Sequence, residues 1–328
     1  MDLTALRAAF RSLADDAVTP YLWSDTDIDG YANATINDAV ERGFLIEDDS
    51  HGSAYVTTTT QGVAGVTAEV QTITVDADAG TFTVTYGDQE TSALAYNVSA
   101  AAMQSALEAL SSVTPGDVVV TLALAVYTLT WANALGDVDA VTVDDSLLLN
   151  PVVDIAVIPG KASYTLDARV LKVTRARMHI RDQHLVITDK DSMDSGNIAP
   201  RVWWPGSETR PNWETTTGLP YALIETTGVI RLVGIPTQND TLRLTVKRLP
   251  LADLSTGTDT PEIRAERHID LLDGMLARAY LKNDVDTRNV EKAAEHEALF
   301  TRNFGPRIDA VVRTQQRTPR SHTTRINW

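Results

Sequence analysis

Apolar residues follow a helical spacing at both ends of the chain and a strand spacing in between. Near the amino terminus they recur every three or four positions, which predicts a first helix. Its apolar residues are Leu3, Leu6, Phe10 and Leu13. A second helix is expected from Ser24, a favourable N-cap, with Asp25 and Asp27 in the first turn, where the helix dipole favours anions. The apolar face predicted for it comprises Ile28, Tyr31, Ala32, Ile36, Ala39 and Val40.

Further along the chain the apolar period becomes alternating. Two strands are expected around residues 73–75 and 82–86, and the turn residues 76–80 between them predict a hairpin. A short amphipathic helix around residues 102–110 and two more strands around residues 118–122 and 127–131 follow. The predicted order in this stretch is therefore strand, strand, helix, strand, strand.

Strand patterns dominate again from residue 163 to residue 249, with turn residues between them, so an antiparallel sheet is expected. Its predicted strands are 164–180, 185–188, 221–225, 229–233 and 242–246. Pro261 then predicts the start of a helix. The apolar face of that helix is expected to comprise Ala265, Ile269, Leu272, Leu276 and Ala279. A last helix from about residue 286 to residue 304 is expected to form an antiparallel hairpin with it.

The distribution of charge suggests where the domains lie. Residues 56–160 contain no Lys or Arg and 12 acidic residues, whereas the other 223 residues hold all 28 basic and 32 acidic residues. Such a step in composition suggests a module inserted into a host domain. The predicted fold class is α+β. The predicted divisions are N-terminal helices (1–55), an inserted acidic β-rich module (56–160), an antiparallel β region (161–250), a helical hairpin (251–309) and an extended basic C-terminal arm (310–328).

Composition excludes several classes of protein. At 328 residues and 43% hydrophobic, the chain can bury sizeable cores, and it has no apolar run of the roughly 18 residues that a membrane span needs. The absence of cysteine excludes disulfides and thiolate chemistry. The segment Met1-Asp2-Leu3-Thr4 lacks a basic, then apolar, signal pattern, so synthesis and assembly in a cytoplasm are expected.

Candidate sites for metal or catalysis are weak. Residues 25–30 match the first half of a calcium loop, but the twelfth position is Ile36, so acidic capping of the helix is favoured over calcium. The sequence contains neither a Gly-x-Ser-x-Gly nor a His-Glu-x-x-His motif, and His268 and His296 are expected at a boundary or on a helix surface. No cofactor, metal or catalytic residue is predicted, and an enzyme is not expected.

Tryptophan and arginine residues are the best candidates for binding a partner. Trp203, Trp204 and Trp213 lie in a loop-like segment, where they could form a local core, a subunit interface or a stacking site for a ligand. The predicted arm has no acidic residue from Ala310 to Trp328. Its candidate docking residues are Arg313, Arg317, Arg320, Arg325 and Trp328, since Arg and aromatic residues dominate binding hot spots.

Several short segments lie on both flanks of the acidic module in a set order and spacing. They are 20–25, 36–42, 164–167, 175–177, 242–250, 261–263, His268, 271–272, 279–280, 292–293, His296 and 304–306. Together they resemble the head-to-tail adaptor proteins of tailed bacteriophages. Within the module, residues 69–75, 80–84 and 93–97 are similar to a small module that recurs in phage structural proteins. Most adaptors of this type lack it at this position.

The resemblance implies a virion protein that forms a ring, commonly of twelve copies, beneath the portal. Such a ring extends the DNA channel towards the tail, so the implied partners are the portal, a downstream tail or nozzle protein and further copies of the chain. The net charge of −16 fits a conduit that DNA passes through without specific binding. The arm would dock on the portal. The alternative is a phage receptor-binding protein in which the tryptophans stack on glycan rings.

Overall fold

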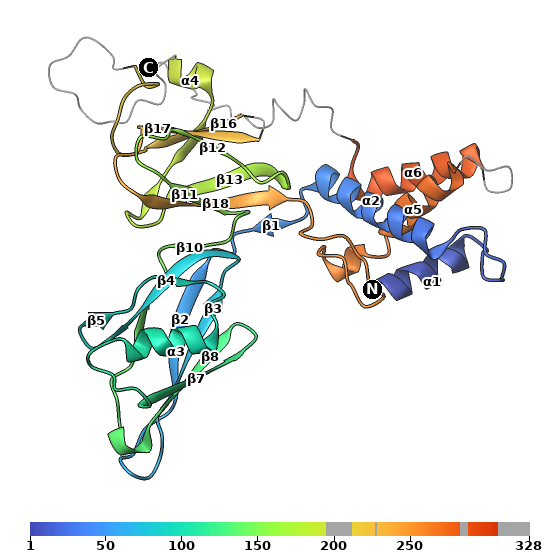
Figure 1. Cartoon of the computed structure of the whole chain (residues 1–328). Helices are drawn as coiled ribbons and strands as arrows, with labels where there is room; N and C mark the ends of the chain where they lie inside the picture. The colour runs from blue at the N-terminus through green and yellow to red at the C-terminus, as the bar shows by residue number, and fades with distance from the viewer. Residues whose placement is uncertain (195–211, 227, 283–287, 308–328) are drawn as a thin grey trace, which may run out of the picture. The chain divides into compact units, whose positions relative to one another are not determined.

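The computed structural model describes residues 1–194, 212–226, 228–282 and 288–307 (Figure 1). The chain divides into two compact units. One, here called the helical unit, comprises residues 1–48, 167–174 and 246–328, and the other, the strand unit, comprises residues 49–166 and 175–245. With helices and several antiparallel sheets, the predicted α+β class is confirmed. None of the helices in the described ranges combines the length and hydropathy of a membrane span.

The described part of the helical unit contains four α-helices. They are α1 (Leu3–Leu13), α2 (Asp25–Gly43), α5 (Leu271–Tyr280) and α6 (Val290–Phe304), with the 3₁₀ turn η2 (Ala265–Arg267) and the short strand β1 (Glu47–Asp48). The side chain of Ser24 accepts a hydrogen bond from the Asp27 amide, and Asp27 bonds back to Ser24, so the predicted N-cap is confirmed as a capping box. The C-cap of α2 is Phe44, which adopts a left-handed conformation with φ of 47°.

The core of this unit forms where the apolar faces of the helices meet. Trp23 is 1% exposed and makes edge-to-face contacts with Phe10 and Tyr280, at 5.6 and 5.9 Å between ring centroids. At Gly274 a Cβ atom would come within 2.5 Å of Thr35 and 2.9 Å of the Phe300 ring, so a glycine lets α5 approach α2 and α6 closely. The expected pairing of the last two helices is confirmed, since α5 packs against α6.

The helix predicted to start at Pro261 was placed too early. Helix α5 begins at Leu271, and Ile269, expected on its apolar face, is exposed. The intervening segment is held in turns by tertiary contacts, because the buried His268 ring lies 2.9 Å from the Ile263 carbonyl and 2.7 Å from the amino group of Met1. His268 was expected on a helix and is instead buried in this turn region.

The first part of the strand unit contains two sheets and a helix. One sheet has the order β2 (Ser53–Thr60), β3 (Val70–Asp76), β8 (Val126–Trp131) and β7 (Val118–Ala123). In the other, β4 (Ala79–Tyr86) pairs with β5 (Gln89–Glu90), β6 (Leu94–Ala95), β9 (Thr142–Asp144) and β10 (Leu148–Leu149). Helix α3 (Ala100–Glu108) packs against β7, and η1 (Asn133–Leu135) is a 3₁₀ turn.

The predicted hairpin over residues 73–86 is wrong. Strand β3 pairs with β2 and β8, whereas β4 pairs with strands of the second sheet. The inward side chains Ile73 and Val75 of β3 share one hydrophobic cluster with Phe82 and Val84 of β4. The two strands therefore meet through side chains in a common core instead of through backbone hydrogen bonds.

The two ends of this first part lie side by side. The Asn150 side-chain amide donates to the Ser50 carbonyl at 2.7 Å. Close by, the buried Asp154 carboxylate accepts from the Gly52 amide at 2.8 Å and from the Asn150 amide at 2.9 Å. At Gly52 a Cβ atom would lie 2.5 Å from the backbone of Leu148, so the chain crosses itself here at a point that only glycine fits.

The second part of the strand unit holds the remaining strands. They are β11 (Asp154–Val157), β12 (Ser163–Thr165), β13 (Val170–Met178), β14 (Gln183–His184), β15 (Val186–Thr188), β16 (Ala222–Thr226), β17 (Val229–Val233) and β18 (Asp240–Arg248), together with helix α4 (Lys190–Asp194). Strands β13 and β18 have residues in both units. Strand β18 pairs with β11 through residues 240–243 and with β1 through residues 246–247.

Two strand predictions for this region need correction. The single strand expected over residues 164–180 is two strands, and β12 and β13 belong to different sheets. The sheet is also not wholly antiparallel, because β15 pairs with β16 in parallel. The connection from residue 189 to residue 221 is long enough for the crossover that parallel pairing requires.

Candidate functional site

The acidic residues of the calcium-like segment are bound by basic side chains of the same unit. Asp25 pairs with Arg11 at 2.6 Å, and Asp27 pairs with Lys282 at 2.9 Å. Asp29, the third, pairs with Arg7. In the described part of the chain no group of three His, Cys, Asp or Glu side chains could hold a metal ion. These carboxylates therefore serve helix capping and ion pairing.

Two histidines are paired with carboxylates. His51 Nδ1 lies 2.9 Å from Asp154, and His296 Nδ1 lies 3.0 Å from Asp273 while its ring stacks on Tyr280. Among the described residues neither imidazole is hydrogen-bonded to a serine or threonine hydroxyl, so neither pair has the geometry of an activated nucleophile.

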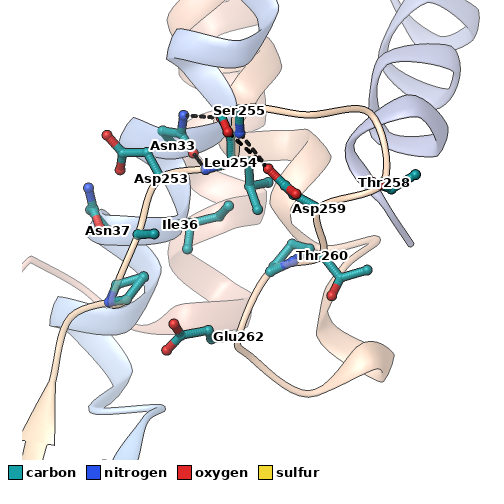
Figure 2. A pocket seen from close by; sticks show the side chains of 13 residues that line it. Asn33, Ile36, Asn37, Asp253, Leu254, Ser255, Thr258, Asp259, Thr260 and Glu262 are labelled. Carbon is teal, nitrogen blue, oxygen red and sulfur yellow. Dashed lines mark hydrogen bonds between the residues drawn. The ribbon is translucent and has the colours of Figure 1, made fainter. Parts of the chain in front are cut away.

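A pocket of about 550 Å³ lies in the helical unit between α2 and residues 250–262 (Figure 2). Its polar groups are bonded to one another. Asn33 donates to the Leu254 carbonyl at 3.1 Å and accepts from the Leu254 amide at 2.9 Å, while Asp259 accepts from the Ser255 amide at 2.8 Å. The Asn33 bonds hold the loop to α2 and the Asp259 bond braces the loop itself, so these polar groups shape the pocket wall.

The densest charged cluster surrounds Asp38, one side of which faces a second pocket. The Asp38 carboxylate, on α2, accepts from Arg42 at 2.9 and 3.0 Å, from Arg278 at 2.8 Å and from Arg307 at 3.0 and 3.3 Å. Arg42 also donates to Glu297 on α6 at 2.8 Å. These five residues, here called the Asp38 cluster, join α2, α5, α6 and the segment that follows α6.

The electrostatics of the cluster favour the ionised carboxylate. Burial of Asp38 opposes its ionisation, but the hydrogen bonds from Arg42, Arg307 and Arg278 outweigh burial and hold its pKa well below the usual value. For Arg307 the hydrogen bond to Asp38 raises the guanidinium pKa. The carboxylate is thus a fixed negative centre for three cations.

The cluster fixes the point from which the predicted arm continues. Besides its carboxylate partners, Arg42 donates to the Thr301 hydroxyl at 3.1 Å and to the Gly305 carbonyl at 3.3 Å. The chain up to Arg307 is therefore tied to α2 and α6. The sequence reasoning missed this cluster as a site. The available signal was an aspartate four residues before an arginine on one helix, Asp38 and Arg42, a spacing that places both on one face.

Most of the predicted partner-binding residues lie outside the described ranges. This applies to Arg313, Arg317, Arg320, Arg325, Trp328, Trp203 and Trp204. Trp213 is half-buried against the strand unit, where its indole Nε1 donates to Asp194 at 2.8 Å. The Arg231 guanidinium lies 5.4 Å from its ring centroid. Protein groups therefore contact both the edge and a face of this indole.

Comparison with known proteins identifies the family. The family model described as SU10 adaptor protein matches residues 116–325. The chain belongs to the SU10 adaptor family. The match begins inside the predicted acidic module and continues through α6 into the predicted arm. The family is one of phage structural adaptors, so the expected phage adaptor class is confirmed.

Other comparisons add little to the family match. No curated protein matches the sequence. Six chains of solved structures match, including one from Mycobacterium phage Patience that is 19% identical over 38% of this chain and 48% of that chain, with a TM-score of 0.20. The present chain thus spans about half the length of that solved chain. At this TM-score the likeness supports no statement about the adaptor's fold or function.

Proposed function

We propose that this adaptor forms a ring beneath the portal of a phage virion, extends the DNA channel and gives the tail its attachment platform. The observation that supports this most directly is the Asp38 cluster next to the predicted arm. It ties the chain to the helices up to Arg307, and the following residues 310–328 contain four arginines, no acid and a terminal Trp328. A basic segment that leaves a fixed point is suited to docking on a second protein.

The charge of the chain supports a conduit rather than a DNA-binding protein. A net charge of −16 for each copy would be repeated around a ring, and a negative wall repels phosphate. In this proposal the genome passes without specific binding, and the partners are the portal, the tail protein below and neighbouring copies. The proposed location is the neck of the virion, after assembly in the host cytoplasm.

The acidic residues 56–160 are proposed to be an inserted module that is not needed for docking. The closeness of Ser50 and Asn150 supports this for the part of the module up to residue 149, because a segment whose two ends meet can be added to a host domain with little disturbance. The proposed position of the module is the outer flank of the ring, away from the channel.

Removal of the arm tests the proposed function. Deleting residues 310–328 should abolish co-sedimentation with purified portal rings while the helical circular dichroism stays unchanged, because the deletion begins beyond the Asp38 cluster. A full-length variant with Arg313, Arg317, Arg320 and Arg325 all changed to Gln separates charge from length, and it should bind portal much more weakly. Unchanged co-sedimentation of the truncated protein would reject the proposed docking role.

A further inference from the structure

The last residue of α1 and the segment that follows it expose four large apolar side chains. Val18 is 80% exposed and Leu13 is 60% exposed, and Tyr21 and Leu22 are each 47% exposed. Leu13, the last of the four apolar residues whose spacing predicted the first helix, is exposed at the end of α1 while the other three are buried. These four residues, here called the loop patch, form a concentration of exposed apolar groups of the kind that marks interaction surfaces.

The loop patch is held in a defined shape. Buried Asp16 accepts from the Leu22 amide at 2.7 Å and from the Arg11 guanidinium at 2.8 Å. The same guanidinium lies 3.7 Å from the centroid of the Tyr21 ring. The next residue, Trp23, is anchored in the core of the unit. A surface that is already ordered loses little conformational entropy when a partner binds.

A second apolar surface of the same unit lacks a partner within the described chain. A groove of about 400 Å³ runs along α5 and α6, which lie side by side in Figure 1. Its apolar lining is Ala277, Leu281, Val290, Ala293 and Ala294. Leu281 and Val290 are 57% and 56% exposed, so the apolar surface of the groove is open to a visiting side chain.

The charges beside the two surfaces are complementary. Residues 13–22, which carry the loop patch, contain no Lys or Arg, and because Asp16 is buried and paired with Arg11, the exposed charge of this segment is Asp15. Of the charged side chains that line the groove, Arg278 and Arg307 share Asp38, and Glu297 pairs with Arg42, while the Arg307 side chain remains 72% exposed. The exposed Asp15 beside the loop patch and the exposed Arg307 beside the groove favour pairing of the two surfaces and disfavour self-pairing of either one.

We propose that the loop patch of one copy packs into the α5–α6 groove of a second copy. The loop patch and the groove are two different surfaces of the same unit, so the contact between two copies is heterologous. When each copy repeats such a contact with the next, the copies form a ring if the rotation between neighbours closes. A second copy is favoured over another protein because it supplies the partner for both surfaces at once. This inference rests on the proposed function, since it names the contact that would build the ring.

Cross-linking between engineered cysteines tests the contact, because the chain has no cysteine of its own. Full-length Val18→Cys and Val290→Cys variants are each prepared, mixed under assembly conditions and treated with a short bismaleimide. The mixture should give a covalent dimer that neither variant gives alone. A chain with both substitutions should give a series of covalent oligomers of increasing size on a denaturing gel. Replacing Val18→Cys by Ile269→Cys, another exposed apolar position of the same unit, should give no dimer with Val290→Cys.

Two results would overturn the proposal. One is a covalent dimer formed by the Val18→Cys variant alone, and the other is the absence of a covalent dimer in the mixture although the protein assembles.

A second variant measures the energy of the contact. Val18→Asp should weaken self-association by roughly tenfold or more in sedimentation, because an unpaired carboxylate would enter an apolar groove, whereas Ile269→Asp should not. If Val18→Asp assembles normally and loses only portal binding, the loop patch contacts the portal and the self-contact is wrong, while the proposed adaptor function stands.

Discussion

The helical unit and the acidic module at residues 56–160 bury carboxylates in different ways. Asp38 in the helical unit is surrounded by three arginines. Glu69 in the module has no Lys or Arg within its segment, and it accepts from the Gln71 side chain at 2.6 Å and from the Val138 amide at 2.8 Å. Both arrangements give the buried carboxylate oxygens hydrogen-bond donors. The arginines around Asp38 also neutralise its negative charge, whereas the neutral donors around Glu69 leave its charge uncompensated.

The way in which each region treats its buried carboxylates affects its stability and its electrostatic potential. The helical unit depends on ion pairs whose loss leaves buried charges without a partner, and its surface charge is largely balanced. The module keeps its 12 negative charges uncompensated within the segment, so it projects a negative potential to its surroundings. A region that positions an arm depends on paired charges, whereas a module proposed for the outer flank of the ring can keep its charges unpaired.

The largest effect is expected from breaking the Asp38 cluster. The Asp38→Asn variant should lose roughly 3–5 kcal/mol of unfolding free energy, because the buried Arg42 and the largely buried Arg278 lose the carboxylate charge that their burial requires. Asp273→Asn is the matched control. It removes a half-buried pair with His296 from the same unit and should cost below about 1 kcal/mol. Urea unfolding followed by circular dichroism at 222 nm measures both, and equal midpoints for the two variants would contradict the assigned role of Asp38.

A smaller effect is expected from pH. The pKa of Asp38 is depressed in the folded protein, so its stabilisation is complete above the unfolded pKa of about 3.9 and is lost as the pH falls towards the folded value. The difference in unfolding free energy between the natural protein and Asp38→Asn should therefore shrink below about pH 4, by up to about 1.4 kcal/mol for each pH unit. A difference that stays constant down to pH 3 would show that Asp38 is not the titrating group.

The smallest effect on the helical unit is expected from removing most of the module. Deletion of residues 53–149, with a short Gly-Ser linker in their place, retains β11 and its pairing with β18. The unfolding free energy of the helical unit should change by less than about 0.5 kcal/mol, because none of its core residues is removed. Loss of the helical circular dichroism in this variant would show that the two regions are not independent.

Local chemistry made much of the helical unit predictable. Ser24 and Asp27 identified the start of α2 because an N-cap is decided by a few adjacent residues. The pairing of β3 and β4 was not predictable from alternation, which shows that a segment is a strand but not which strand it joins. The start of α5 depended on contacts of His268 with Met1, which lies 267 residues away.

The candidate site was harder to predict than the fold. Asp38 lies 240 residues from Arg278 and 269 residues from Arg307, so no local pattern shows that they meet. The residues that the sequence suggested most strongly for docking, from Arg313 to Trp328, have an unusual composition but lie outside the described ranges. Composition can thus suggest where a partner binds, whereas a buried charge cluster becomes visible only when distant segments are brought together.

The bond between Asn150 and Ser50 makes the base of the acidic module a natural place for exchange. A folded domain whose termini lie close together could be grafted between these two residues without stretching the host chain. The same property would let related phages gain, lose or swap a domain at this position while the rest of the adaptor stays unchanged. It also offers an insertion point for a fluorescent or affinity domain in an intact particle.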